Sequence, residues 1–157
     1  MIEYIVRIDN YGNQTWYHNG QLHRLDGPAI ETVIGERFWY YNGLLHREDG
    51  PAVEWPDGTK KWCRHGQFHR EGGPAIEAVN GNRFWYQNGQ LHRLDGPAVE
   101  YDDGTRRWFF NDREFTENEF NTLLKKSTVF NRSNQIIEMT VEEICQALGK
   151  TVKIVKG

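Results

Sequence analysis

A unit of 23 residues recurs along most of this chain with no insertion or deletion between copies. Tryptophan opens each unit, a His-Arg pair follows, and a Gly-Pro pair comes soon after it. A fixed period of this length is typical of repeat architectures, in which each unit packs mainly on its neighbours. The sequence therefore predicts an elongated array, whose units begin near Trp16, Trp39, Trp62, Trp85 and Trp108.

Each unit carries the signal for a tight β-hairpin. Asn-Gly, the strongest short-range indication of a two-residue hairpin turn, occurs in the first, second and fourth units. His65-Gly66 takes its place in the third unit, where histidine tolerates the required positive φ less comfortably than asparagine. A turn at Asn42-Gly43 places Tyr40 opposite Leu45.

A second turn lies at the other end of each unit and predicts the strand register. At Pro56-Asp57-Gly58, a three-residue loop sets Glu54 opposite Lys60. Opposite charges recur at this offset in every unit, as expected if cross-strand pairs fix the register. The equivalent pairs are Glu31 with Arg37, Glu77 with Arg83, and Glu100 with Arg106.

Alternation along the predicted strands assigns side chains to two faces. One face carries Trp39 and His46 beside the charge pairs. The other carries Phe38 and Tyr40, together with Arg47, and is expected to be the packed side.

These patterns predict a mainly β protein. We expect an elongated, single-layer antiparallel β-meander of 23-residue hairpin repeats over residues 1–111. The Asp-Gly-Pro-Ala link between hairpins must form a strand end or bulge, because proline cannot donate to a β-ladder. Residues 112–157, in which the repeat decays, form a small α/β C-terminal cap.

Capping boxes and apolar runs indicate the elements of this cap. Thr116-Glu117-Asn118-Glu119 and Thr140-Val141-Glu142-Glu143 each precede an apolar helical pattern. Short β-rich runs at Gln135–Glu138 and Val152–Val155 indicate strands. Repeat arrays need ends that do not aggregate, and this segment can cover one of them.

Composition excludes several classes of protein. The net charge of −3 lacks the positive excess of a nucleic-acid coat protein, so no DNA partner is expected. Two cysteines are too few for a disulfide scaffold, and a mean hydropathy of −0.78 with no long apolar run argues against a membrane span. Without a signal-peptide pattern at the N-terminus, we expect a cytoplasmic protein.

The repeat also carries a family resemblance. The motif Asn-Gly-x-Leu-His-Arg-x-Asp-Gly-Pro-Ala, within residues 12–110, resembles MORN-type repeats and is similar to a variant repeat of bacteriophage and giant-virus proteins. It also distantly resembles MORN-variant antitoxin-like proteins of bacteria. The resemblance implies an elongated single-layer sheet, an intracellular location and a binding role. It implies no shared enzymatic activity.

Metal binding and catalysis find little support in the pattern. Equivalent histidines of successive units lie about 9.5 Å apart, whereas two ligands of one zinc ion must approach to about 3.5 Å. Cys63 could act as a nucleophile with His65 or His69 as base, but it occupies the position that tyrosine holds in other units. We therefore expect a packing cysteine, no metal, no cofactor and no enzyme.

The arginines that follow the histidines suggest both structure and binding. Their expected role is to pair with the aspartate two residues later and brace the Asp-Gly-Pro bend. Gly72 replaces that aspartate in the third unit, which leaves Arg70 with only Glu71 adjacent and makes this unit locally basic. Exposed aromatics and arginines dominate binding hot spots, so the candidate partner contacts are Trp39, Trp62, Arg64, Arg70 and Trp85.

The expected function is therefore binding without catalysis. The phage-like resemblance implies a viral accessory protein that binds and inhibits a host protein, such as a defence effector, in the host cytoplasm. One alternative is a protein that sequesters a nucleotide or other small molecule, since Trp and Arg can stack on bases. Another is a MORN-like scaffold at a membrane surface, which the negative charge disfavours.

Overall fold

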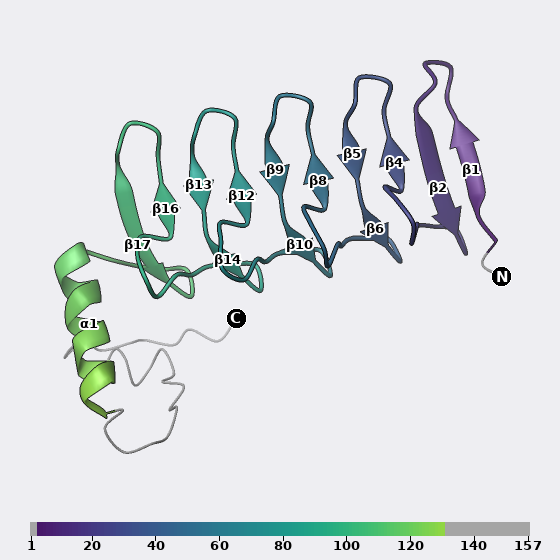
Figure 1. Ribbon diagram of the computed structural model, residues 1–157. Coiled ribbons are helices and arrows are strands. Elements are labelled where there is room, and N and C mark those ends of the chain that lie inside the picture. The colour runs from purple at the N-terminus through teal and green to yellow at the C-terminus, as the bar shows by residue number, and fades with distance from the viewer. Residues whose placement is uncertain (1–2, 131–157) are drawn as a thin grey trace, which may run out of the picture.

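Short antiparallel strands build one long open sheet in the order expected of a meander. The computed structural model describes residues 3–130, with side chains as far as Leu124. Twelve strands form the sheet, and each pairs with the strands that precede and follow it in the array (Figure 1). The predicted mainly β, antiparallel meander is confirmed.

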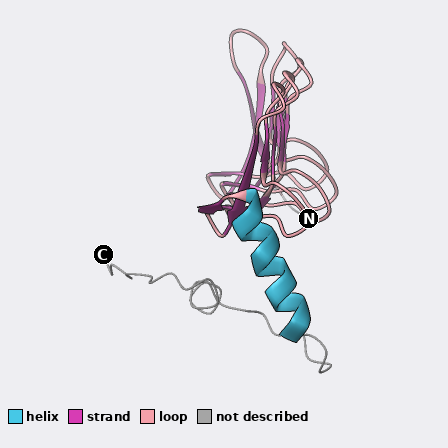
Figure 2. Ribbon diagram, turned by 90° about the vertical axis from the view of Figure 1, so that its left-hand side faces the viewer, coloured by secondary structure: helices cyan, strands magenta, loops and turns pink. Residues whose placement is uncertain are grey.

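Two sets of strands alternate along the chain. The ladder of the long sheet contains β1 (Ile5–Ile8), β2 (Gln14–His18), β4 (Ile30–Glu31), β5 (Arg37–Phe38), β8 (Val53–Glu54), β9 (Lys60–Lys61), β12 (Ile76–Glu77), β13 (Arg83–Phe84), β16 (Val99–Glu100), β17 (Arg106–Phe110) and β18 (Arg113–Phe115). The Asn-Gly-type turns close separate hairpins, namely β6 (Tyr40–Tyr41) with β7 (Leu44–Leu45), β10 (Cys63–Arg64) with β11 (Gln67–Phe68), and β14 (Tyr86–Gln87) with β15 (Gln90–Leu91). In the first unit, β3 (Gln21–Leu22) pairs directly with β2. Seen edge-on, the loops at one end of the ladder project to one side of the sheet (Figure 2).

The predicted register is confirmed at both turns. Tyr40 pairs with Leu45, and Glu54 pairs with Lys60. The Asn42 turn residue has a φ of 47° and His65 one of 49°, both in the left-handed region that two-residue turns of this kind require.

The core is thin and runs along the array. One alanine of each Asp-Gly-Pro-Ala link has no exposed surface, and its carbonyl accepts a hydrogen bond from the tryptophan N–H of the neighbouring strand, as Ala52 does from Trp39 at 2.8 Å. Val53 and Val99, each next in sequence to one of these alanines, are buried as well, and so is Cys63. A larger side chain at an alanine position would overpack this layer.

The predicted assignment of Arg47 to the face opposite Trp39 is wrong. Its guanidinium carbon lies 4.0 Å from the centroid of the Trp39 ring. Strand alternation holds within the ladder, but the chain leaves the ladder after Trp39 to form the β6–β7 hairpin. The alternation of side chains between the two faces of the sheet therefore does not continue across this bend.

The helix α1 (Glu117–Phe130) begins at the C-terminal end of the array and extends away from the sheet (Figure 1). The predicted capping box is formed, because the Thr116 N–H donates to the Glu119 carboxylate at 3.0 Å and the Glu119 N–H donates to the Thr116 hydroxyl at 3.3 Å. Phe120 and Leu123 pack with Phe115 of the last strand. The predicted second helix and the two predicted strands of the cap lie outside the described residues.

Replacing the one atypical turn residue tests the turn assignment. His65→Asn restores the residue that the other turns use at this positive φ, and we expect a gain of up to about 1 kcal/mol in the free energy of unfolding. The reverse change in the fourth unit, Asn88→His, should cost a similar amount. Urea unfolding of the three proteins measures both, and a loss of stability in His65→Asn would contradict the assignment.

Candidate functional site

One arginine in each unit joins the Asp-Gly-Pro bend to the tryptophan and to the ladder. The Arg47 guanidinium stacks on Trp39, and its Nε donates to Asp49 at 2.9 Å. Its terminal nitrogen donates to the Pro51 carbonyl and to Glu54, at 3.2 Å in each case. We call this set of contacts the arginine clamp. The predicted bracing of the bend by Arg47 and Asp49 is confirmed, and the clamp extends well beyond that pair.

The full arginine clamp recurs at Arg93 of the fourth unit, whereas, within the described part of the chain, Arg24 lacks the bond to a glutamate and Arg70 lacks the aspartate. The stacking on tryptophan and the bond to the proline carbonyl are present in all four complete units. The distances from guanidinium carbon to indole centroid are 4.1, 4.0, 3.7 and 4.0 Å, for Arg24 on Trp16, Arg47 on Trp39, Arg70 on Trp62 and Arg93 on Trp85. The backbone N–H of each arginine also donates to the next unit, as that of Arg24 does to the Tyr40 carbonyl at 3.2 Å. Each clamp therefore fixes both its own unit and the next one.

Most glutamates of the ladder bind a clamp arginine rather than the basic residue that lies opposite them on the next strand. Glu54 lies opposite Lys60, as predicted, yet its carboxylate binds Arg47. Only in the first unit does the predicted cross-strand pair appear as an ion pair, between Arg37 and Glu31 at 3.2 Å. The register was thus predictable from the charges although most of the ion pairs were not.

Both candidate arginines of the third unit are paired with carboxylates, so Arg70 is not left with Glu71 alone. Arg70 lacks an aspartate but binds Glu77 at 2.6 Å, and Arg64 binds Glu48 at 2.6 Å. The hydrogen bond from Arg64 holds the pKa of the Glu48 carboxyl below its usual range. The two arginines proposed as contacts are therefore already paired with carboxylates.

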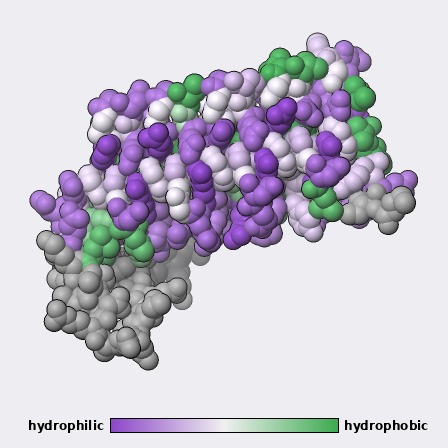
Figure 3. Space-filling view, in the orientation of Figure 1, coloured by the Kyte–Doolittle hydropathy of each residue, from purple (hydrophilic) through white to green (hydrophobic). Residues whose placement is uncertain are grey.

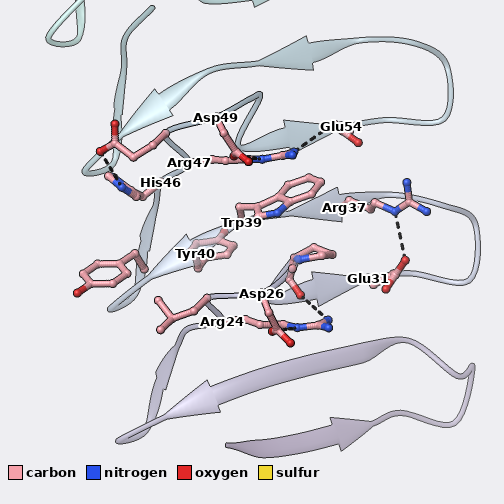
Figure 4. A pocket seen from close by; sticks show the side chains of 15 residues that line it. Arg24, Asp26, Glu31, Arg37, Trp39, Tyr40, His46, Arg47, Asp49 and Glu54 are labelled. Carbon is pink, nitrogen blue, oxygen red and sulfur yellow. Dashed lines mark hydrogen bonds and ion pairs between the residues drawn. The ribbon is translucent and has the colours of Figure 1, made fainter. Parts of the chain in front are cut away.

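Two adjoining grooves lie on the face that carries the clamps. The first, of about 810 Å³, lies between the first and second units, and the second, of about 320 Å³, lies between the second and third. Arg47, Glu48 and Asp49 line both, so the grooves form a continuous track. Figure 4 shows Trp39 between the layer of Arg47 and that of Arg24.

The first groove has an aromatic wall and an excess of carboxylates. Trp39, Tyr40, Tyr41 and His46 line it. Five carboxylates accompany three arginines, namely Asp26, Glu31, Glu48, Asp49 and Glu54 with Arg24, Arg37 and Arg47. The side chains of Asp26 and Asp49 are 77% and 83% exposed, so their carboxylates face solvent at the rim. Hydrogen bonds from the clamp arginines hold the pKa of both carboxyls below the ordinary value, which keeps them ionised.

The structure distributes the predicted contact residues over this track. Trp39 lines the first groove, whereas Trp62, Arg64 and Arg70 line the second. Trp85 lies outside both grooves and is stacked under Arg93. All three tryptophans are half-buried rather than fully exposed. Their part in partner binding stays a prediction.

Sequence reasoning missed the acidic rim and the environment of Glu48. Glu48 occupies a position that is leucine in the first and fourth units, and this difference was the available signal. It lies 3.3 Å from His46 as well as binding Arg64. Glu48 therefore links the second and third units at the boundary between the two grooves.

The histidines connect consecutive hairpin turns. The Nδ1 atom of His46 accepts the His65 N–H at 3.1 Å, and that of His69 accepts the Asn88 N–H at 3.2 Å. In both cases the ring nitrogen accepts from a backbone amide of the next unit. An accepting Nδ1 requires the neutral ring with its proton on Nε2.

Cys63 lies in the buried layer, where its thiol is a weak nucleophile. It is 2% exposed, and burial raises its pKa to about 11. The thiolate is the reactive form of cysteine, so little of it is present at neutral pH. Among residues 3–130, no group of three or more His, Cys, Asp or Glu side chains is placed to hold a metal ion.

No protein-family model matches the chain, and no curated protein and no solved structure matches it either. Within the described part of the chain, no helix is both long enough and apolar enough to cross a bilayer.

As the pH falls, the histidine contacts should weaken before the carboxylates of the clamps are protonated. Burial, followed by the nearby His65, lowers the pKa of His46 below its ordinary value of 6.5. The unfolded chain then binds this proton more readily, so this contribution to stability is complete above pH 6.5 and decreases as the pH falls below it. Thermal unfolding from about pH 8 to about pH 5 should show a smaller loss for His65→Asn, which removes one of the causes that lower the pKa of His46. Equal losses in wild type and variant would contradict this account.

The clamp should depend on the shape of arginine and not only on its charge. Arg47→Lys keeps the charge but loses the planar fork and most of the stacking, and we expect it to cost about 1–2 kcal/mol. Arg37→Lys, at an exposed pair outside any clamp, is the matched control and should change stability by less than about 0.5 kcal/mol. Equal effects in urea unfolding would show that the clamp adds nothing beyond a surface ion pair.

Proposed function

We propose that this chain is a non-catalytic binding protein whose clamp-bearing face receives an extended, basic segment of another protein. The observation that supports this most is the track of two adjoining grooves that share Arg47, Glu48 and Asp49. A ligand that follows this track contacts three consecutive units, as is typical for the extended surfaces of repeat proteins.

The chemistry of the first groove favours a cationic side chain. One face of the Trp39 indole is covered by Arg47, and the other is turned toward the layer of Arg24 and Asp26 (Figure 4). A lysine or arginine of the partner can stack on this second face while the exposed Asp26 carboxylate neutralises it. This side chain of the partner would make the same two contacts as a clamp arginine, since it would stack on an indole and pair with an aspartate.

The clamps lower the cost of binding. Each of the four tryptophans is held by a guanidinium that is itself fixed by hydrogen bonds to the bend. Side chains that are already immobile lose little conformational entropy when a partner binds. The aromatic wall is therefore pre-organised for its ligand.

The resemblance to phage and giant-virus repeats extends this proposal to a viral accessory protein. Its partner would be a host protein, such as a defence effector, which it blocks by occupying a basic segment. The location would then be the cytoplasm of the host cell. Burial raises the pKa of the Cys63 thiol, which disfavours this residue as a nucleophile.

The charge of the track disfavours the two alternatives. Nucleotides and anionic lipid headgroups both bring phosphate, which the exposed carboxylates of Asp26 and Asp49 repel. A nucleotide-binding protein would nevertheless show a raised melting temperature in a screen of cyclic and linear nucleotides.

Neutralising the acidic rim tests the proposal with a matched control. A random peptide library selected on the immobilised wild-type protein should yield peptides rich in lysine and arginine. Their affinity for Asp26→Asn/Asp49→Asn should fall about tenfold, which corresponds to the loss of two partly exposed charge contacts.

Asp95→Asn is the control, because Asp95 binds its own clamp arginine but lines neither groove. Binding should be unchanged in this variant. Selection of acidic peptides, or equal losses in the two variants, would overturn the proposal.

A further inference from the structure

The two ends of the array differ, because nothing among residues 3–130 covers the N-terminal end. The helix α1 packs against the last strands, whereas β1 has a neighbour on one side only among the described residues. Ile5, Val6 and Ile8 of β1 are 61%, 46% and 68% exposed. Figure 3 shows hydrophobic residues gathered at this end of the molecule. Exposed apolar edge strands readily pair with another strand.

Backbone geometry shows which groups of β1 are available. The Trp16 N–H donates to Ala29 on the far side of β2, so its neighbours Thr15 and Tyr17 turn their backbone groups toward β1. These two residues pair with Arg7 and Ile5. By alternation, the N–H and C=O groups of Tyr4, Val6 and Ile8 point outward to the free edge.

The charges on this edge are not compensated within the described residues. Neither Glu3 nor Arg7 takes part in an ion pair there, although most arginines of the array do. Arg7 is held over the Tyr17 ring at 4.9 Å, on the same face of the sheet as Ile5. Asp9 is different, because its carboxylate accepts hydrogen bonds from Tyr11 and Asn13 in the adjoining turn.

From these observations we infer that β1 pairs antiparallel with β1 of a second copy of this chain, around a two-fold axis at Ile5. In this register the outward-facing backbone groups of Tyr4 meet those of the partner's Val6. Glu3 lies opposite the partner's Arg7, and this pair forms twice because of the symmetry. The two sheets then continue as one.

Charge selects this register over its neighbours. Moving the axis to Val6 sets Glu3 opposite the partner's Asp9, and moving it to Arg7 sets two arginines against each other. Like charges placed directly opposite are destabilising in a sheet. Of these three registers, only the one with its axis at Ile5 places opposite charges across from each other.

Charge reversal and its complementation test this dimer on the full chain. The paired strand is short, so association is expected to be weaker than for a standard interface of roughly 1,600 Å². Sedimentation equilibrium should therefore cover concentrations from about 1 µM to about 1 mM. Wild type should dimerise over this range. Glu3→Arg and Arg7→Glu should each weaken dimerisation on the order of tenfold, because both pairs become repulsive.

Complementation separates a direct pair from a general loss of structure. An equimolar mixture of Glu3→Arg and Arg7→Glu, and the double variant Glu3→Arg/Arg7→Glu, should each recover wild-type association. Val6→Pro removes an outward N–H that β2 does not use and should abolish the dimer with the β-sheet circular dichroism unchanged. A monomer at every concentration, a dimer insensitive to the charge reversals, or no recovery in the mixture would overturn the inference.

Discussion

Stacking of a guanidinium on an indole, repeated at the same place in each unit, is the interaction on which the array depends. A single-layer sheet has too little depth for an ordinary hydrophobic core, and the fully buried side chains here are mostly alanine. The arginine clamp adds a second kind of cohesion, since one planar group contacts the tryptophan, the bend and the glutamate of the ladder at the same time. Lysine has neither the fork nor the flat surface for these contacts.

The clamp also determines what the surface offers to a partner. Arg64 and Arg70 of the third unit are both paired with glutamates of the array, so neither guanidinium is left without a carboxylate. The charges left at the rim are carboxylates such as Asp26 and Asp49, which are paired on one side and exposed on the other. The same interaction that holds the array together therefore gives the first groove its acidic character.

Local sequence patterns predicted the fold well, because the same pattern recurs in several units and each copy supports the same interpretation. The Asn-Gly turns and the charge pairs set the register, and the Thr116 capping box set the start of the helix. The position of Arg47 was not predictable by strand alternation, because the chain bends away from the ladder after Trp39. The candidate site was predicted in part, since Trp39, Trp62, Arg64 and Arg70 do line the grooves. The acidic rim and the role of Glu48 depend on contacts between units, which spacing within one unit does not reveal.

Hydrogen exchange followed by NMR tests the central claim most directly, because it observes the clamp and the sheet in one experiment. If the clamps hold the array together, the Arg47 Nε–H should exchange as slowly as the backbone N–H groups of Trp39 and His46, which bond to Ala52 and Trp39. The same opening of the unit would then expose all three. Rapid exchange of the arginine proton beside slowly exchanging backbone amides would show instead that the sheet persists without its clamps.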